Sequence, residues 1–473
     1  MTQRGSGWLL GLTATASLMV ALDATAVATA LTKIRLDLAA TMEQLEWTVN
    51  AYSLSFAVLL MTGAALGDRF GRRRMFVAGL GLFTAASAAC AAAPGIGWLI
   101  AARAVQGCGA AIVMPLAMAL LSNGFPPERR GRALGIFTGL TGLAVVAGPV
   151  VGGIVTEGLA WQWIFWLNVP IGLVSIPLVL RRVPESRGGG ASFDLGGVLL
   201  VTGGALGLVW GLIRADGSGW GAFEVDGALA AGAVLLAGFV AWELRVPQPM
   251  VPMRLLRSRG FSAGNASGLF MYAALYGSLF FVTQFFQTGL GDGPMATGLK
   301  LIPWTATVTV IAPVTGVLVN RIGARAFTVA GLALQGVGMG WIALIADPST
   351  SYPQLIAPMI IAGAGVSMAM PAAQTAVINA VAAPEIGKAS GVFNTLRQLA
   401  AVVGVAVAAA VFTAKGGYGT AQTFSDGFVP AIAVSAALSL AGALAGLFIP
   451  GPDRAARISP VPAVSRPAPE PTR

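Results

Sequence analysis

The chain lacks histidine, contains only two cysteines and carries few charges. Charged residues make up 10% of its 473 residues, whereas apolar residues make up 56%. So few charges cannot cover an ordinary soluble enzyme, in which about a quarter of the residues are charged. The two cysteines exclude a disulfide-rich secreted scaffold, and the apolar content excludes a disordered chain. Without histidine, proton chemistry must use carboxylates that nearby arginines tune.

Long apolar stretches recur along the chain. Each is long enough to cross a bilayer as a helix, which takes about 20 residues. The fourteen stretches lie near 8–30, 46–67, 75–93, 97–122, 133–155, 163–181, 195–213, 224–243, 261–290, 296–319, 326–346, 354–380, 389–413 and 428–449. The first stretch is too long for a signal peptide and contains Asp23, so it counts as a span. We therefore predict an all-α polytopic membrane protein with 14 transmembrane helices.

The basic residues are distributed unevenly between the two sides of the membrane. Fourteen spans place both termini on one side, and that side holds 22 of the 29 lysines and arginines. The opposite side holds 5, and Arg103 and Arg397 lie within spans. Because such an excess marks the cytoplasmic side, both termini are predicted to lie in the cytoplasm, with the chain in the cell inner membrane. The net charge of +10 is then a topology signal, and we expect no nucleic-acid partner.

An eight-residue pattern, L-x-[DN]-R-x-G-x-R, occurs at 66–73 and again at 318–325. The two copies follow the second and the tenth span, so the spans divide as six plus two plus six. Repeated halves around a site at the membrane midplane are typical of transporters. The predicted parts are an N-terminal six-helix half (1–182), a two-helix insert with linkers (183–258), a C-terminal six-helix half (259–450) and a disordered cytoplasmic tail (451–473).

Asp23 lies inside the first span, where a charge is costly and therefore indicates function. At 1.5 Å per residue, Asp23 and Arg103 both lie about 9–10 Å below the outer boundary of the membrane, so the two can pair. One hypothesis is that the pair takes up and releases a proton near neutral pH. The alternative is a structural ion pair between two helices. No other acid is placed deep in the membrane by this counting.

The loop after the second span carries Asp68, Arg69, Gly71, Arg72 and Arg73. Glycine permits a sharp turn, and the charges can form a latch that breaks and re-forms as two halves rock. The same arginines also serve as anchors on the cytoplasmic side.

The fifth span contains Gly148, Pro149, Gly152 and Gly153. Small residues at a spacing of four let helices approach closely, and an internal proline permits a kink. The string predicts a gating role in addition to tight packing.

Polar side chains form a stripe on the ninth span. At 100° per residue they fall within about 60° of one another, which favours contact with water or protein rather than lipid. The stripe consists of Asn265, Tyr272, Tyr276, Thr283 and Gln287, with Phe280 beside it. It is our main candidate for a substrate-cavity wall, and helix packing is the alternative. Further cavity candidates are Tyr52, Gln106, Trp304 and Arg397, although Arg397 could instead extend toward the cytoplasm.

Neither metal nor ATP chemistry is indicated. Cys90 and Cys108 lie at different depths, which argues against a disulfide or a metal site. The phosphate-binding pattern G-x-x-x-x-G-K-[ST] does not occur in the sequence. We therefore expect no cofactor, with protons as the coupling ion.

Six strings in order resemble the major facilitator superfamily, specifically its fourteen-span drug:proton antiporter group (the EmrB/QacA type). They lie at 22–27, 64–73, 103–111, 148–153, 161–165 and 168–172. The resemblance covers about residues 8–450, and the string at 148–153 is similar to a motif that marks exporters.

This resemblance implies a proton-coupled antiporter that exports hydrophobic or amphipathic drugs or antibiotics by alternating access. Asp23 would be the protonation site, and the transporter would work as a monomer in the lipid bilayer. One alternative is a proton-coupled or facilitative importer of a metabolite. Another is a membrane enzyme or lipid-handling protein, which would need a cluster of acids or metal ligands at an interface.

Overall fold

The computed structural model describes residues 3–125, 127–187, 194–219, 221–247, 249, 251, 253–381 and 385–451. Within these ranges the protein is helical and contains no strand, which confirms the all-α prediction. The predicted disordered tail, 451–473, lies outside the described residues except for Gly451. The elements are α1 (Gln3–Asp37), α2 (Met42–Phe70), α3 (Arg72–Ala91), α4 (Ile96–Gly124), α5 (Pro127–Gly158), α6 (Trp163–Trp166), α7 (Asn168–Arg182), α8 (Leu195–Ser218), α9 (Phe223–Glu243), η1 (Met253–Arg257), α10 (Arg259–Gln284), η2 (Phe285–Gly289), α11 (Pro294–Lys300), α12 (Ile302–Ile322), α13 (Ala324–Ile345), α14 (Tyr352–Asn379), α15 (Ile386–Thr413) and α16 (Ala421–Gly446).

All fourteen predicted spans fall on these helices. Twelve helices of the described chain are long and apolar enough to cross a membrane, and the bent α2 makes thirteen. The one remaining predicted span, 133–155, lies inside α5. Short helices extend three of the spans, because α6 continues into α7, α10 into η2 and α11 into α12. The protein is therefore a multi-pass membrane protein, and the predicted count fits the observed helices.

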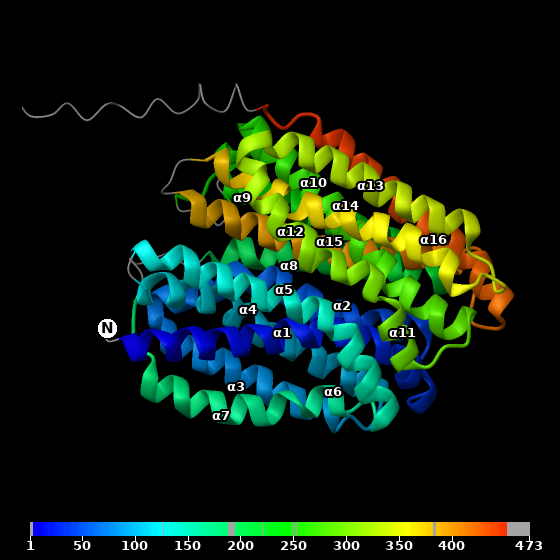
Figure 1. Cartoon of the computed structure of the whole chain (residues 1–473), viewed down its shortest axis with the longest axis horizontal. Helices are drawn as coiled ribbons and strands as arrows, with labels where there is room; N and C mark the ends of the chain where they lie inside the picture. Colours follow the sequence, from blue (N-terminus) through cyan, green and yellow to red (C-terminus); the bar gives the residue numbers. More distant parts are fainter. Residues whose placement is uncertain are drawn as a thin grey trace, which may run out of the picture.

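The helices run side by side in one elongated bundle, with the N-terminus at one end and α11 at the other (Figure 1). We call these ends the N-terminal end and the distal end. Helices α1–α7 form one group, the N-terminal half, and α10–α16 form a second group, the C-terminal half. Helix α8 packs on α9 and also contacts α2 and α15, so it bridges the two groups. The boundaries proposed at 182, 258 and 450 are consistent with this arrangement and stay a prediction.

The two copies of the repeated eight-residue pattern have the same backbone conformation. Gly71 and Gly323, the sixth residues of the copies, have φ values of 108° and 103°. Each amide donates to the carbonyl four residues earlier, at 3.0 Å for Gly71 and 2.9 Å for Gly323. A side chain at such a φ is strained, so glycine makes the turn between one membrane helix and the next.

Apolar packing is continuous across the two halves toward the distal end. A single buried cluster there combines Leu31 and Phe165 of the N-terminal half with Phe281, Trp304 and Phe412 of the C-terminal half. Removing large apolar side chains from water is the main source of such cohesion. The distal end is therefore the closed end of the bundle in this structure.

Candidate functional site

Asp23 and Arg103 form an ion pair deep inside the N-terminal half. The Arg103 Nη1 atom donates to Asp23 Oδ2 at 2.5 Å. The side chains are 0% and 1% exposed, so water does not screen the pair. Helices α1 and α4 supply the two residues, whose contact agrees with the pairing that counting residues along the spans allowed.

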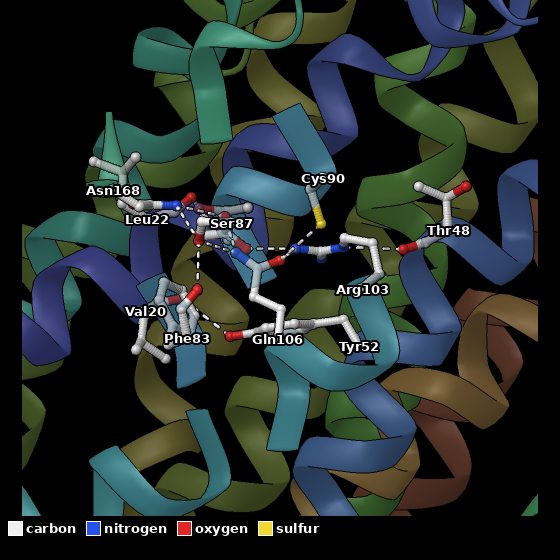
Figure 2. Close-up of polar contacts among 12 residues, drawn as sticks. Val20, Leu22, Thr48, Tyr52, Phe83, Ser87, Cys90, Arg103, Gln106 and Asn168 are labelled. Atoms are coloured by element: carbon white, nitrogen blue, oxygen red, sulfur yellow. Dashed lines mark hydrogen bonds and ion pairs between the residues drawn. The ribbon is translucent and has the colours of Figure 1, made fainter. Parts of the chain in front are cut away.

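Neutral amides complete the environment of the carboxylate. The Asp23 Oδ1 atom accepts from Gln106 Nε2 and from Asn168 Nδ2, both at 2.9 Å. The Gln106 amide also donates to Ser87 Oγ at 2.8 Å, and Asn168 lies 3.4 Å from the same hydroxyl. The network thus joins α1, α3, α4 and α7, and Figure 2 shows its dashed contacts. Gln106, predicted for the cavity, belongs to this network.

The guanidinium of Arg103 has further partners besides Asp23, among them the Phe165 ring, whose centroid is 5.7 Å from the guanidinium carbon. The guanidinium donates through Nη1 to Gln106 Oε1 at 2.7 Å and through Nε to the Thr48 carbonyl at 3.2 Å. The Tyr52 ring lies 4.2 Å from the guanidinium carbon, in a cation–π arrangement. A buried charge pair persists only when additional hydrogen bonds satisfy both groups, and that condition is met here.

A small cavity adjoins this network between the two halves. Its lining residues are Ala24, Thr25 and Ala28 of α1, Val49, Tyr52 and Ser53 of α2, Tyr276, Leu279 and Phe280 of α10, and Gln398, Ala401 and Val405 of α15. The free space is about 40 Å³, enough for about three water molecules. Drug-sized ligands occupy pockets of about 300–1,000 Å³, so the halves must separate to admit one.

The predicted cavity candidates are spread over different surroundings. Tyr52, Tyr276 and Phe280 line the cavity. Asn265 donates to the Phe261 carbonyl within its own helix, and Thr283 donates to the Leu279 carbonyl. These two side chains, like those of Gln287 and Trp304, are buried and are not among the lining residues.

Tyr272 and Arg397 lie beside the cavity rather than in its lining. The guanidinium carbon of Arg397 is 5.7 Å from the Tyr272 ring centroid, and Tyr272 stacks on Tyr276 at 6.4 Å. Sequence reasoning left open whether Arg397 faces the cavity or the cytoplasm. The structure places it against an aromatic ring one helical turn from cavity residue Ala401.

The α5 glycines lie at two close helix contacts. A Cβ atom at Gly148 would lie 1.8 Å from Thr25 Oγ1, and one at Gly152 would lie 2.5 Å from the Ala26 carbonyl oxygen. Both contacts join α5 to α1, beside the helix that carries Asp23.

Gly153 and Pro149 form the second contact, between α5 and α11 of the opposite half. A Cβ atom at Gly153 would lie 2.3 Å from the Pro294 carbonyl oxygen. Across the same contact, Gly298 approaches the Pro149 carbonyl so closely that a Cβ there would lie 2.5 Å from it. The α5 string therefore forms part of the surface at which the halves meet.

Further polar contacts connect the halves at the distal end. Gln287 donates to the Thr29 carbonyl at 2.9 Å, and the Met295 amide donates to Glu157 Oε2 at the same distance. The Arg35 guanidinium carbon lies 4.3 Å from the Tyr418 ring centroid. These contacts close the distal end above the cavity.

The charged loop at 66–73 contacts the end of α7 and the residues just after it. The Arg72 Nη2 atom pairs with Asp68 Oδ1 at 2.7 Å. Arg73 donates its amide to Glu185 Oε1 at 2.9 Å and its Nη1 atom to the Val183 carbonyl at 3.2 Å. Arg69 lies against its neighbour Phe70, 5.5 Å from the ring centroid. The start of α3 is thereby tied to the end of α7.

Several residues of the site were not identified from the sequence. Ser87, Asn168 and the Thr48 carbonyl support the ion pair, and Gln398 lines the cavity. Small polar residues are common in membrane helices, so composition alone does not single them out. Glu46 is also buried, at 3% exposure, so Asp23 is not the only buried acid of the membrane helices. Its position four residues into α2 made it look like a helix-end residue.

Comparison with known proteins gives a consistent result. The family model described as Major Facilitator Superfamily matches residues 13–293 and 266–471. The chain is 34% identical over 418 residues to the Tetracenomycin C resistance and export protein of Streptomyces glaucescens, which covers 88% of this chain and 77% of that protein. It is 33% identical over 462 residues to the Methylenomycin A resistance protein of Streptomyces coelicolor. This alignment covers 96% of this chain and 94% of that protein.

Among solved structures, the fold is similar to the crystal structure of peptide transporter POT in complex with sulfate. The TM-score is 0.71 at 15% identity, with 96% of this chain and 95% of that chain covered. At this identity the similarity concerns the fold alone.

Proposed function

Because the chain belongs to the major facilitator superfamily and is thus a membrane transporter rather than an enzyme, we propose that it exports hydrophobic or amphipathic drugs or antibiotics in exchange for protons. Relatives named for antibiotic resistance and export support the direction of transport. The proposal places the chain in the inner membrane with both termini in the cytoplasm, as the distribution of basic residues predicts. It needs no ATP, no nucleic acid and no cofactor besides protons. Because Asp23, its partners and the cavity all lie in one chain, a monomer suffices.

The single observation that carries the proposal is the position of Tyr52. One side of this residue covers the Arg103 guanidinium, and the residue also lines the cavity between the halves. A change at the Asp23–Arg103 pair must therefore alter a wall of the cavity. Substrate in the cavity must in turn act on the pair, because coupling between two sites is reciprocal.

Proton transfer would act on the helices as follows. A proton on Asp23 removes the negative charge and leaves Arg103 without its ionic partner in a site that excludes water. A buried guanidinium without an ionic partner is unfavourable. A rearrangement of helices α1 and α4 that relieves this cost is therefore favoured. Moving one charge across the membrane supplies about 2.3 kcal/mol per 100 mV, which is available to drive the cycle.

The closed distal end fits one state of an alternating-access cycle. In the opposite state, the α5–α11 contact and the Gln287–Thr29 contact have to open so that substrate leaves at the distal end. Glycines that pack closely against the backbone of another helix bury little side-chain area. Such contacts therefore suit an interface that opens and closes. The charged contacts at the start of α3 would rearrange in the same step.

The test is transport of a fluorescent drug into everted membrane vesicles with an imposed pH gradient. We expect gradient-dependent uptake into vesicles that contain the unmodified protein and its loss in Asp23→Asn. The matched control is Asp226→Asn, the same substitution at an exposed position in α9, which should retain transport. Gradient-dependent transport in Asp23→Asn would remove Asp23 as the coupling site. Accumulation of metabolites in right-side-out cells, with no export of any drug, would instead support the importer.

A further inference from the structure

The charge of the cavity surroundings differs between the two halves. In the N-terminal half, Asp23 and Arg103 neutralise each other at 2.5 Å. In the C-terminal half, the membrane-embedded cation is Arg397 of α15. The described acids of that half are Asp292, Asp347, Glu385 and Asp426, and they bind Lys300, Ser349, Arg254 and Gln422, respectively. Among the described residues, Arg397 has no ion-pair partner.

Arg397 lies well inside α15, and its side chain is half-buried. It is eleven residues after the first residue of α15, which corresponds to about 16 Å along the helix axis. Its Nε atom is buried and has no hydrogen-bond partner among the described residues. An unpaired guanidinium nitrogen at this depth is costly, so a partner that the protein itself lacks would be stabilising.

The surroundings of Arg397 are continuous with the cavity. Arg397 precedes the cavity residue Ala401 by one helical turn, and Tyr272 precedes the cavity residue Tyr276 by one turn on α10. Residues four apart lie on the same face of a helix. The guanidinium contacts the Tyr272 ring, and that ring stacks on Tyr276. Gln398, beside Arg397 in sequence, lines the cavity directly.

We infer that Arg397, Tyr272, Tyr276 and Gln398, called here the Arg397 cluster, bind an anionic group of an aromatic substrate. The inference rests on the proposed export function and specifies its substrate class. A guanidinium binds a carboxylate or phenolate through short charge-assisted hydrogen bonds, and a carboxylate through two at once. The stacked tyrosines offer a flat surface to the aromatic part of such a molecule. A cationic drug would meet a like charge at the same place.

The experiment measures equilibrium binding rather than transport, so that it does not depend on proton coupling. The full-length protein in uncharged detergent micelles is titrated with two fluorescent dyes, diethylaminocoumarin carboxylate and its neutral ethyl ester. We expect the carboxylate to bind at least about tenfold more tightly than the ester. Arg397→Gln should weaken carboxylate binding about ten- to a hundredfold and change ester binding by less than about twofold.

Two variants separate charge recognition from folding. Arg397→Lys keeps a point charge but loses the planar fork, so its affinity for the carboxylate should lie between those of the unmodified protein and Arg397→Gln. Arg259→Gln removes an arginine at the exposed start of α10 and should leave both affinities unchanged. Ester binding reports whether each variant is folded.

Three outcomes would overturn the inference. The first is equal weakening of both dyes in Arg397→Gln, which would make Arg397 a packing residue. The second is a carboxylate that fails to bind the unmodified protein, or binds no more tightly than the ester. The third is loss of the carboxylate preference when phosphatidylglycerol, but not phosphatidylcholine, is added, since a lipid headgroup would then be the anion. Loss of gradient-driven efflux with an intact carboxylate preference would contradict the proposed coupling and leave the Arg397 cluster standing.

Discussion

Tyr52 lies with its ring 4.2 Å from the guanidinium carbon of Arg103, and the same residue lines the cavity between the two halves. Its hydroxyl donates to the Val20 carbonyl at 3.3 Å, which fixes the ring against α1. A single aromatic side chain therefore contacts the ion pair, the first helix and the substrate space.

The ring of Tyr52, rather than its hydroxyl, should be needed for coupling. A desolvated cation–π contact is worth about 2 kcal/mol, and Tyr52→Leu removes it together with the cavity wall. We expect Tyr52→Leu to lower gradient-driven drug transport into everted vesicles about tenfold or more, whereas Tyr52→Phe keeps most of it. Binding of the drug in detergent, measured alongside, shows how much of the loss is due to the cavity. Full efflux by Tyr52→Leu would contradict this role.

Removing one partner of the Asp23–Arg103 pair should destabilise the protein more than replacing both partners by uncharged residues. Arg103→Leu leaves a buried carboxylate without its cation, which costs about 3–5 kcal/mol in comparable sites. Replacing both partners, as in Asp23→Asn with Arg103→Leu, removes both charges and should recover part of that loss. Thermal unfolding in detergent compares the stabilities of the single and the double variant. The result that would count against the idea is a double variant as unstable as Arg103→Leu.

The equal depth of Asp23 and Arg103 could be predicted from the sequence, because helical rise is constant and the span ends were placed within a few residues. The places of Asn168 and Ser87 in the network could not be predicted, because they depend on how α7 and α3 are rotated about their axes. No repeating pattern encodes that rotation. The polar contacts of this network were therefore visible only in three dimensions.

The polar stripe on α10 illustrates a second limit of sequence reasoning. Its angular position could be predicted from the helical period, but the stripe from Asn265 to Gln287 extends about 33 Å along the axis. A cavity that occupies the middle of the bundle touches only Tyr276 and Phe280 of this helix face. At the distal end of the stripe, Gln287 instead contacts Thr29 of the other half.

Gly153 should control how easily the distal end closes. A Cβ atom at this position would lie 2.3 Å from the Pro294 carbonyl oxygen, so Gly153→Ala must push α5 away from α11. We expect lower efflux and faster thiol labelling of a cysteine introduced at Gln287, in a background with Cys90 and Cys108 replaced by alanine. The matched control is Gly158→Ala near the end of the same helix, where nothing lies within 4 Å of a new Cβ. Unchanged labelling in Gly153→Ala would show that this contact does not hold the distal end closed.

Asp194 should stabilise the α8–α9 hairpin in a pH-dependent way. Burial raises the pKa of its carboxyl, but hydrogen bonds from the Gly197 amide and the Trp242 indole outweigh burial, and the pKa is lowered. The Gly197 and Trp242 bonds are both 2.8 Å long. A lowered pKa in the folded protein means that the charged form contributes stability above the unfolded value of about 3.9, and that this contribution is lost as the pH falls through the folded value.

Two substitutions separate the charge of Asp194 from its role as a helix cap. Asp194→Ala removes both and should cost about 1 kcal/mol at neutral pH, whereas Asp194→Asn keeps a good cap and should cost less. Because acid removes only the charge, the unmodified protein should approach the stability of Asp194→Asn as the pH falls below the unfolded value of about 3.9 and through the lower folded value. Thermal unfolding at neutral and acidic pH measures this convergence, with Asp226→Asn as the control for an exposed acid. If the difference between Asp194→Asn and the unmodified protein stayed constant over that fall in pH, the charge of Asp194 would not be what holds α8 to α9.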